Sequence, residues 1–388
     1  MTTNLAAEVV LDSTIQYHPF KSTVLPESIF LTGSTGFLGV YLLDELLRTT
    51  TTATIYCLIR GENPLARLQN QLELYALWQD SFKSRIIPIT GNLAEPKFGL
   101  SELAFENLAA KIDIIYHNGA LVNAVYPYAQ LKAPNVLGTQ EVLRLASLNH
   151  TKPVHFVSTV AIFFSQPYLH RTVYESEIPT IDESFKGGYK QSKWVAEQLV
   201  REAQQRGLPA SIYRLGRVLG HSEMGILGTV KDLICIVLKG CIQLGQFPKV
   251  ETNINLIPCD YTVQAIAKLS QNSCSDYHTF HLYNPSSMPW SDILMVLQNL
   301  GYQLEEVSYQ TWMTSLKTTV AQHPKDKFYA TLGILMRSPL ALFGLKPYFD
   351  STQTQTALNL TLPTTAILAT HYLTHLQQTR YFDSECNC

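Results

Sequence analysis

A run of glycines at fixed spacing, placed just after a short apolar segment, constrains the fold of this chain more than any other feature. Residues 29–32 have the pattern of a buried parallel strand, and Gly33, Gly36 and Gly39 follow at intervals of three. Apolar residues then recur at helical spacing, so the glycines occupy a strand-to-helix turn. In such a turn backbone N–H groups and a helix N-terminus can bind a pyrophosphate, because no Cβ intervenes. The pattern predicts a dinucleotide site, although a tight turn with close helix packing would produce the same spacing.

The second predicted strand, Ala53 to Ile59, ends in a residue that bears on the choice of cofactor. That residue is Arg60. Sites for an unphosphorylated ribose carry Asp or Glu at about this position, whereas an Arg accommodates a 2′-phosphate. The sequence therefore favours NADPH over NADH. Arg67 would add a second positive charge, unless it belongs to a solvated helix face.

Strand and helix patterns alternate through the first half of the chain. After the first two strands, we expect further strands at residues 85–90, 112–116, 154–157 and 210–213, with helices at 66–78, 130–148 and 189–205. Such alternation predicts an α/β fold with a doubly wound parallel sheet of the Rossmann type, covered on both faces.

The domain organisation follows from where this alternation begins and lapses. Residues 1–27 are expected to be an N-terminal linker, and residues 28–218 the NADP-binding domain, with 255–285 returning to it. The more helical segments 219–254 and 286–388 are expected to form a smaller, mostly helical substrate-binding domain.

Composition excludes several other classes of protein. The net charge is −2 and only 15% of residues are charged, which implies no nucleic acid partner. The apolar stretch Leu332 to Leu345 is interrupted by Arg337 and Pro339 and is too short for an integral membrane segment. No signal peptide is expected. None of the seven cysteines has zinc-ligand spacing, so we expect no metal, and free thiols in a cytoplasmic protein.

Polar and small residues follow two of the predicted strands and could contact a cofactor. Asn92 and Leu93 follow the third strand, where a polar side chain can face an adenine, although Asn92 serves equally well as a turn residue. Small residues after the fourth strand, at 118–120, would let a ligand approach the backbone. His117, which precedes them, is expected to be structural because it has no evident partner.

Three Tyr/Lys pairs lie four residues apart, which places both side chains on one helix face: Tyr17/Lys21, Tyr128/Lys132 and Tyr189/Lys193. Only Tyr189 opens a long helix soon after a strand that ends in hydroxyl residues. We therefore predict a catalytic triad of Thr159, Tyr189 and Lys193, with Ser158 as an alternative hydroxyl. Tyr189 would protonate the oxyanion formed by hydride transfer, Lys193 would lower the pKa of Tyr189, and Thr159 would donate to the developing charge.

With these motifs in place, the chain resembles the extended short-chain dehydrogenase/reductases. Within that group it resembles most the thioester reductase domains that end nonribosomal peptide and polyketide synthetases, and their relatives in carboxylic acid reductases. The resemblance is strong over residues 28–262 and rests on Leu31–Gly39, Tyr56–Arg60, Tyr116–Ala120, Asn135–Thr139, Val157–Thr159, Gly188–Trp194, Ile212–Arg214, Gly220–Ser222 and Lys239–Gly245. Ala6 to Ile15 is similar to the linker between a carrier domain and such a reductase.

This resemblance implies an activity, a cofactor and a partner. It implies NADPH-dependent release of an acyl or peptidyl thioester, bound through phosphopantetheine to a carrier protein, as an aldehyde or further as an alcohol. The implied cofactor contacts are Gly33, Thr35, Gly36, Phe37, Leu38, Gly39, Arg60, Asn92, Leu93, Asn118, Gly119, Ala120 and Lys193. The chain departs from the family pattern at Asn92, usually Asp, at Leu215, usually Pro, and at Pro134, which disturbs the helix carrying Asn135.

Three alternative functions remain open at this point. A fatty acyl-CoA reductase differs only in how the acyl group is presented. An epimerase or ketone reductase acting on a sugar nucleotide or a free carbonyl shares the superfamily, but Arg60 disfavours the NAD-retaining epimerases. A non-enzymatic NADP-binding protein would keep the glycine turn without needing both Tyr189 and Lys193.

Overall fold

The computed structural model describes residues 4–20, 26–230, 232–272, 278–335, 344 and 346–383. The chain forms two compact units, and each is described by itself. The first comprises residues 1–216, 262–282 and 347–360, and the second comprises residues 217–261, 283–346 and 361–388. The segment 347–360 thus belongs to the first unit, although the sequence analysis assigned it to the substrate-binding domain.

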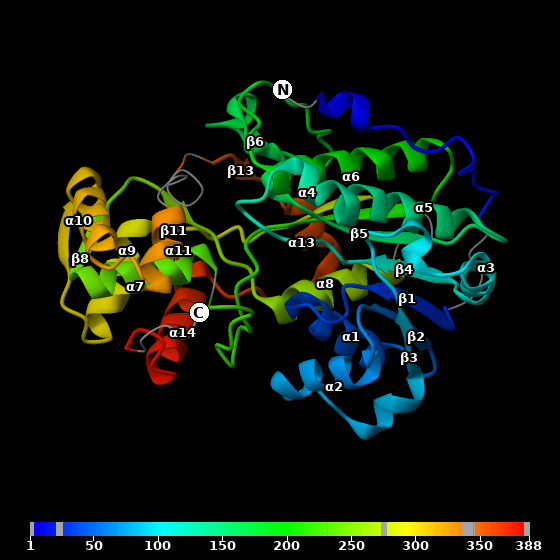
Figure 1. The fold of residues 1–388 in the computed structure, drawn as a ribbon, viewed down its shortest axis with the longest axis horizontal. Helices are drawn as coiled ribbons and strands as arrows, with labels where there is room; N and C mark the ends of the chain where they lie inside the picture. The colour runs from blue at the N-terminus through cyan, green and yellow to red at the C-terminus, as the bar shows by residue number, and fades with distance from the viewer. Residues whose placement is uncertain are drawn as a thin grey trace. The chain divides into compact units, whose positions relative to one another are not determined.

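A seven-stranded sheet forms the centre of the first unit (Figure 1). All of its paired neighbours run parallel, in the order β10-β7-β5-β4-β1-β2-β3. The strands are β1 (Ser28–Thr32), β2 (Thr54–Ile59), β3 (Ile86–Thr90), β4 (Ile114–His117), β5 (Val154–Thr159), β7 (Ala210–Leu215) and β10 (Thr279–Leu282). The order reverses between β1 and β4, and in sheets of this kind ligands bind at the carboxyl ends of the strands at that reversal. The predicted Rossmann-type α/β fold is confirmed.

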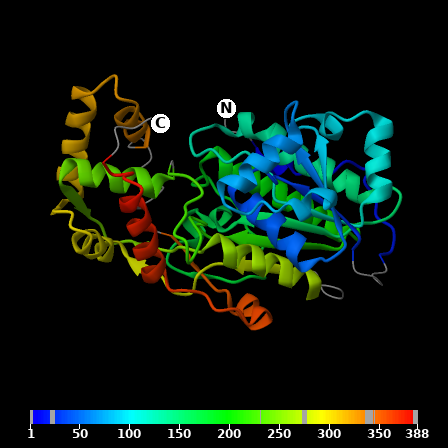
Figure 2. The same cartoon turned by 90° about the horizontal axis from the view of Figure 1, so that it is seen from below.

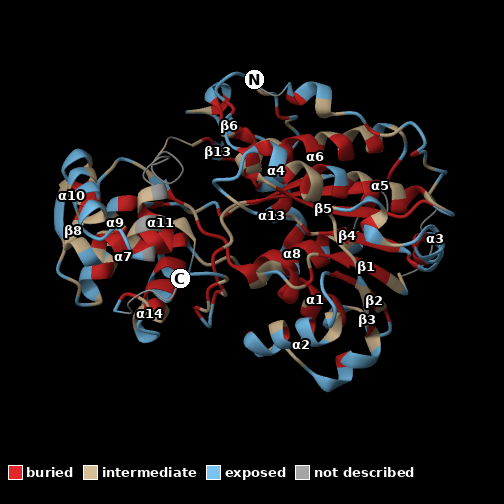
Figure 3. Ribbon diagram, viewed as in Figure 1, coloured by how far each residue is buried: buried red, intermediate tan, exposed pale blue. Residues whose placement is uncertain are grey.

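Helices cover both faces of this sheet (Figures 1 and 2). The helices of the first unit include α1 (Phe37–Thr49), α2 (Pro64–Leu74), α3 (Glu102–Lys111), α4 (Tyr128–Lys132), α5 (Gly138–Ser147), α6 (Gly188–Gln205), α8 (Cys259–Asn272) and α13 (Thr352–Leu358). Successive strand residues face opposite sides, and β4 illustrates this. Tyr116 contacts Ser270 of α8, with 2.7 Å between the hydroxyl oxygens, whereas His117 contacts Thr139 of α5 at 3.0 Å. The central strands are therefore buried from both sides (Figure 3), whereas the edge strand β3 is partly exposed.

A π-helical turn interrupts the helix predicted at residues 130–148. It spans Ala133–Leu137 between α4 and α5 and contains Pro134. Proline lacks an N–H and its ring crowds the carbonyl four residues earlier, so the regular hydrogen-bond ladder cannot continue through it. The prediction of a disturbance at Pro134 is confirmed, and it takes the form of a widened turn.

The N-terminal segment packs against the first unit. Leu11 and Ile15 are buried. Arg206, just past the end of α6, donates to the carbonyl oxygens of Leu11, Asp12 and Ile15 at 2.7–3.0 Å. A guanidinium that satisfies three carbonyls fixes the path of this extended segment.

Two of the three Tyr/Lys pairs lie in or against this N-terminal segment. The Tyr128 hydroxyl donates to the carboxylate of Glu8 at 3.1 Å, and Lys132 forms an ion pair with the same carboxylate at 2.6 Å. Tyr17 donates to the carbonyl oxygen of Leu143 at 3.2 Å, and Lys21 lies outside the described residues. Tyr128 and Lys132 therefore act together in holding the N-terminal segment.

The second unit is mostly helical. Its elements are α7 (Leu233–Leu244), β8 (Gln246–Lys249), β9 (Asn253–Ile254), β11 (Met288–Pro289), α9 (Trp290–Asn299), β12 (Glu305–Ser308), α10 (Tyr309–Gln322), α11 (Lys327–Leu335) and α14 (Thr365–Gln378). Strands β8 and β12 pair parallel, and β9 pairs with β11 antiparallel. Trp290 stacks on Phe247 with ring centroids 4.7 Å apart and donates to the Pro248 carbonyl at 2.9 Å, so its indole is both packed and satisfied.

Several expectations concern features that the structure describes only in part. Cys57, Cys235, Cys241 and Cys259 are buried free thiols, and the other three cysteines lie outside the described residues. Helix α11 ends at Leu335, and residues 336–343 and 345 of the apolar stretch also lie outside them. None of the helices in the described part of the chain has the length and apolar character needed to cross a bilayer. Across the same residues, no three His, Cys, Asp or Glu side chains are grouped so that they could hold a metal ion.

Candidate functional site

The glycine turn between β1 and α1 is packed so closely that side chains would not fit at Gly33 and Gly39. Gly33 has φ of +75°, and a Cβ there would lie 2.7 Å from the Cα of Gly119. A Cβ on Gly39 would overlap the carbonyl oxygen of Gly33. Gly36 precedes the first residue of α1, and no side chain caps that N-terminus. The first backbone N–H groups of α1 and the positive end of its dipole are therefore available to an anion.

The predicted contacts Thr35, Phe37 and Leu38 belong to this turn and to the first turn of α1. All three are partly exposed. The ring of Phe37 packs against Tyr41 and Tyr75, with centroids 5.4 and 5.6 Å away. Phe37 therefore anchors the helix start against α2, and its backbone remains available to a ligand.

Two arginines lie close together after β2. Arg60 is exposed, and its carbonyl oxygen accepts a hydrogen bond from the Arg67 guanidinium at 2.9 Å. No carboxylate among the described residues pairs with the Arg60 guanidinium. The bond from Arg67 places a second positive charge beside Arg60, which suits a dianionic phosphate.

The residues after β3 and β4 meet the glycine turn. A Cβ on Gly119 would lie 2.6 Å from Leu93 and 3.1 Å from the backbone nitrogen of Gly33. The Asn118 amide approaches the Gly33 carbonyl at 3.5 Å, and Ala120 follows in the same loop. The carboxyl ends of β1 and β4 thus lie side by side at the reversal of strand order, and Leu93, which follows the edge strand β3, reaches Gly119 there.

Asn92 is held by its own turn. Its side-chain oxygen accepts from the Ala94 N–H at 3.1 Å, and its amide donates to Glu95 at 3.0 Å. This is the local pattern that Asn side chains favour in turns. The bond to Glu95 uses one of the two N–H donors of the amide and fixes its orientation.

His117 lies in a buried chain of hydrogen bonds beneath the site. Its Nδ1 contacts the Thr32 hydroxyl at 2.8 Å and its Nε2 contacts the Thr139 hydroxyl at 3.0 Å. Thr32 in turn accepts from the Gly119 N–H at 2.9 Å. Burial, assisted by the nearby Lys193, lowers the pKa of His117 to about 3, so the ring is neutral at pH 7. The imidazole braces the turn at Gly119, in agreement with a structural role.

The two hydroxyls that end β5 have different partners. Ser158 donates to the buried carboxylate of Glu197 at 2.7 Å. The Thr159 oxygen accepts from the Ala161 N–H at 3.2 Å and has only a long contact, 3.5 Å, to the Leu215 carbonyl. Ser158 is therefore committed to Glu197 and is not the alternative donor that the sequence suggested, whereas the Thr159 hydroxyl hydrogen is free to turn toward a ligand.

Tyr189 lies in the first turn of α6. A Cβ on the preceding Gly188 would lie 2.6 Å from the backbone nitrogen of Tyr128, which shows how tightly the helix start is packed. No hydrogen-bond partner of the Tyr189 phenol exists among the described residues. Burial raises the pKa of Tyr189 to about 12. The expected lowering of this pKa by Lys193 is wrong for this structure, because desolvation of the phenolate dominates.

Lys193 is buried one turn further along α6. Its ammonium donates to the Val157 carbonyl of β5 at 2.8 Å and lies 4.1 Å from the centre of the Phe156 ring. Burial lowers its pKa to about 7, and the negative charge of Glu197 opposes this shift. Lys193 is thus hydrogen-bonded to the carboxyl half of β5, the strand whose last residue is Thr159.

Asn135 connects the loop after β4 to α6. Its side chain accepts from the Leu121 N–H at 2.7 Å and donates to the Leu121 carbonyl at 3.0 Å. It also donates to the Ser192 hydroxyl at 2.9 Å, and Ser192 donates to the Tyr189 carbonyl at 2.8 Å. The π-helical turn therefore places the Asn135 side chain where it links the backbone at Leu121 to the first turn of α6 through Ser192.

A buried ion pair that the sequence patterns did not predict lies behind the site. Glu197 and Arg214 are both fully buried, with 2.7 Å between Oε1 and a guanidinium nitrogen. The spacing of four residues from Lys193 to Glu197 is the signal in the sequence that could have directed attention to this carboxylate.

Several known proteins are similar to this chain in sequence. Residues 31–266 match the NAD-binding family described as Male sterility protein. The chain is 44% identical over 329 residues to a linear gramicidin synthase polypeptide of Brevibacillus parabrevis, covering 83% of this chain and 6% of that protein. It is 35% identical over 328 residues to the L-2-aminoadipate reductase large subunit of Eremothecium gossypii, covering 79% of this chain and 24% of that protein. The chain thus spans a small part of these relatives.

A solved structure is similar over almost the whole chain. It is the crystal structure of the terminal R domain from the myxalamid PKS-NRPS biosynthetic pathway. Its TM-score is 0.90 at 39% sequence identity, and the match covers 97% of this chain and 98% of that chain.

Proposed function

The chain belongs to the NAD-binding family of Male sterility proteins, and on that premise we propose that it is an NADPH-dependent thioester reductase. It is an oxidoreductase that uses a nicotinamide cofactor. The proposed substrate is an acyl or peptidyl thioester carried on phosphopantetheine, released as an aldehyde. The observation that carries the proposal is that Lys193 of α6, one turn after Tyr189, donates to the Val157 carbonyl of β5, the strand that ends in Thr159. Strand β5 lies in the same sheet as β1, whose glycine turn has no room for side chains at Gly33 and Gly39.

The residues of the turn fit a dinucleotide. Its glycines leave room for phosphates where a Cβ would collide with backbone, and the uncapped N-terminus of α1 offers N–H donors. In the proposed arrangement Gly33, Gly36 and Gly39 surround the pyrophosphate. Asn118, Gly119 and Ala120 would lie along the cofactor, and Lys193 would donate to the nicotinamide ribose. Asn92 and Leu93 would lie near the adenine.

The proposed chemistry assigns a proton and a hydrogen bond to the protein. When bound, the nicotinamide cofactor would supply the hydride that adds to the thioester carbonyl carbon. Tyr189, which stays protonated because its pKa is raised to about 12, donates its proton to the carbonyl oxygen. Thr159 donates a hydrogen bond to the same oxygen as charge develops. The resulting hemithioacetal loses its thiol and leaves an aldehyde.

The preference for NADPH is proposed on the basis of Arg60 and Arg67. The Arg67 guanidinium is held at the backbone of Arg60 by its bond to the Arg60 carbonyl, so a second positive charge lies at the end of β2. Loss of one charge-assisted hydrogen bond costs about 1.5–3 kcal/mol. We therefore expect Arg60→Ala to reduce the ratio of kcat/KM for NADPH over NADH by roughly 10- to 100-fold, since about 1.4 kcal/mol corresponds to a factor of ten.

One assay tests the function as a whole. The purified chain is offered octanoyl-CoA, octanoyl-pantetheine and an octanoyl-loaded carrier protein, while NADPH absorbance is followed and aldehyde is trapped. We expect the carrier-bound thioester to be used best. A preference for octanoyl-CoA would instead indicate an acyl-CoA reductase, and reduction of ketones without any thioester would contradict the proposal.

The proposed acid is tested separately. Tyr189→Phe removes the proton donor and retains the ring, so turnover should fall by roughly 10²–10⁴-fold while NADPH binding is retained. A Tyr189→Phe protein with native turnover would remove this phenol from the reaction.

A further inference from the structure

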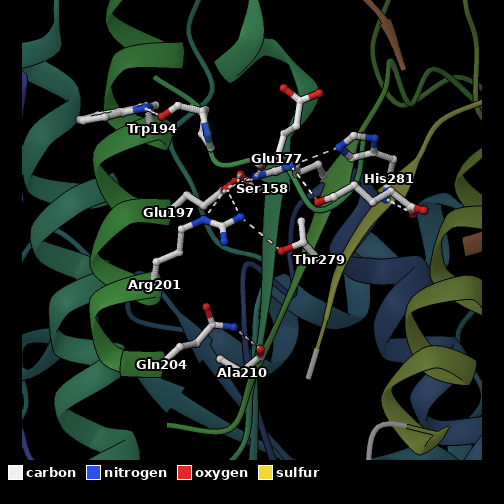
Figure 4. Close-up of polar contacts among 12 residues, drawn as sticks. Ser158, Glu177, Trp194, Glu197, Arg201, Gln204, Ala210, Thr279 and His281 are labelled. Atoms are coloured by element: carbon white, nitrogen blue, oxygen red, sulfur yellow. Dashed lines mark hydrogen bonds and ion pairs between the residues drawn. The ribbon is translucent and has the colours of Figure 1, made fainter. Parts of the chain in front are cut away.

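Glu197 has no role in the reaction proposed above, yet it lies directly behind the proposed site. It follows Lys193 by four residues, so the two side chains share a face of α6. Its carboxylate is fully buried and makes polar contacts with three side chains (Figure 4). Arg214 contacts Oε1 at 2.7 Å, Arg201 contacts the same oxygen at 3.1 Å, and Ser158 donates to Oε2 at 2.7 Å.

We propose that Glu197 is a positioning residue that keeps the Lys193 ammonium charged and fixes the end of strand β5 through Ser158. The inference rests on the proposed function, because it assumes that Lys193 acts in its charged form. Glu197 would act on the site through Lys193 and Ser158 and not by contact with the substrate.

The charges around Lys193 support the first part of this proposal. On α6 the titratable neighbours are Tyr189 and Glu197, and β4 contributes His117, which is neutral at pH 7. Strand β5 contributes the Val157 carbonyl, and Arg214 of β7 and Arg201 of α6 act through Glu197. Among the described residues, Glu197 is the negative charge that opposes the effect of burial on Lys193.

The geometry of β5 supports the second part. Ser158 and Thr159 are consecutive, so their side chains face opposite sides of the sheet. The bond from Ser158 to Glu197 fixes the end of β5 to helix α6 on the face of the sheet opposite to the Thr159 side chain. Arg214 is itself fixed, since it donates to the carbonyls of Glu175 and Glu177 and contacts His281 at 3.2 Å. A rigid carboxylate therefore holds the strand that presents Thr159.

The test compares pH profiles of three variants with the wild type, using NADPH and octanoyl-pantetheine. Glu197→Gln removes the negative charge but leaves the cations of Arg201 and Arg214. Lys193 should then lose its proton more easily, so the alkaline limb of kcat/KM should move to lower pH by about one unit or more. At the pH where the wild type has half of its maximal kcat/KM, Glu197→Gln should then have roughly a tenth of its own maximal kcat/KM. Glu197→Asp keeps the charge and should keep the limb near its wild-type position.

Arg201→Gln is the matched control. It removes a positive charge from the same cluster and breaks the same ion pair, because Arg201 is a partner of Glu197. It therefore disturbs the cluster as Glu197→Gln does, but its electrostatic effect on Lys193 has the opposite sign. Its alkaline limb should stay in place or move to higher pH. A shift to lower pH in Arg201→Gln as well would mean that loosened packing causes the effect, and the inference would be overturned.

A binding measurement provides a second readout and guards against misfolding. NADPH binding followed by fluorescence across the same pH range should weaken at lower pH in Glu197→Gln than in the wild type. Should the lone buried Arg214 prevent folding, Glu197→Gln/Arg214→Met removes both charges. Loss of the Arg214 cation partly offsets loss of the carboxylate, so the limb should move to lower pH by less than in Glu197→Gln alone. An unshifted limb in whichever of these proteins folds overturns the inference.

The two proposals can fail separately. If Lys193→Met keeps full turnover, or if the wild type does not bind NADPH, the proposed function itself is wrong. If Lys193→Met is inactive while removal of Glu197 leaves the pH profile and NADPH binding unchanged, only the role of Glu197 is wrong.

Discussion

Gly33→Ala is the substitution that tests the cofactor turn most directly. The new side chain meets two obstacles. The backbone at Gly33 has φ of +75°, a conformation that costs an L-residue about 1–2 kcal/mol. The new Cβ would also lie 2.7 Å from the Cα of Gly119 and 2.8 Å from its nitrogen, which are backbone atoms with no flexible end to move. Overpacking of this kind adds about 1–3 kcal/mol, so the expected loss of stability is about 2–5 kcal/mol.

Substitutions at two other glycines, Gly61 and Gly36, measure the backbone cost and the crowding cost one at a time. Gly61→Ala has φ of +98° but nothing within 4 Å of the new Cβ, so it carries the backbone cost alone. Gly36→Ala has an ordinary φ and a Cβ at 3.3 Å from the Gly33 carbonyl oxygen, so it carries only mild crowding. Both controls should be destabilised less than Gly33→Ala, by about 2 kcal/mol or less.

Urea unfolding at pH 7 and NADPH fluorescence titration measure the outcome. If the turn opens to relieve the contact, the loss appears as weaker NADPH binding and less as lower stability, because the strained loop is the proposed phosphate site. If Gly33→Ala and Gly61→Ala had the same stability and the same NADPH affinity, the close approach of the residues after β1 and β4 at this turn would be refuted.

Three further outcomes are expected. Thr159→Val should lower turnover by roughly 10²–10³-fold by removing a donor to the oxyanion, whereas Ser158→Ala should affect turnover less, and the reverse order in steady-state assays would exchange their roles. Ile15→Ala should lower the free energy of urea unfolding by about 2–5 kcal/mol because the side chain is fully buried, and no change would show that the N-terminal segment does not pack on the first unit. Burial lowers the pKa of both His117 and His155 from 6.5 to about 3, so the unfolded chain takes up these protons first as the pH falls. Stability should therefore decline below pH 6.5, by up to about 1.4 kcal/mol per pH unit for each histidine, and unchanged urea midpoints between pH 7 and 5 would contradict their burial.

Features governed by local physics could be predicted from the sequence. The glycine turn could be recognised because only residues without a Cβ allow a strand to turn this tightly into a helix. Strand and helix positions in the first half followed from the periodicity of apolar residues, and Pro134 marked a break because it lacks an N–H. Helix α3 was not predicted, although Phe105, Leu108 and Ala109 lie at helical spacing on its buried face.

Features that depend on several distant segments were settled by the tertiary structure. Neighbouring residues in the sequence, Ser158 and Thr159, differ in availability because Glu197 lies behind one of them. Identical spacing in three Tyr/Lys pairs gave no way to see that one of them binds Glu8, more than a hundred residues earlier in the chain.

The sequence alone therefore determined the class of fold, the glycine turn and the helix that begins with Tyr189, because each depends on conformational preferences within a few residues. The tertiary structure decided the order of the strands, the partners of each buried charge and the addition of residues 347–360 to the first unit. These depend on desolvation and on contacts between segments far apart in the chain, which no local pattern encodes.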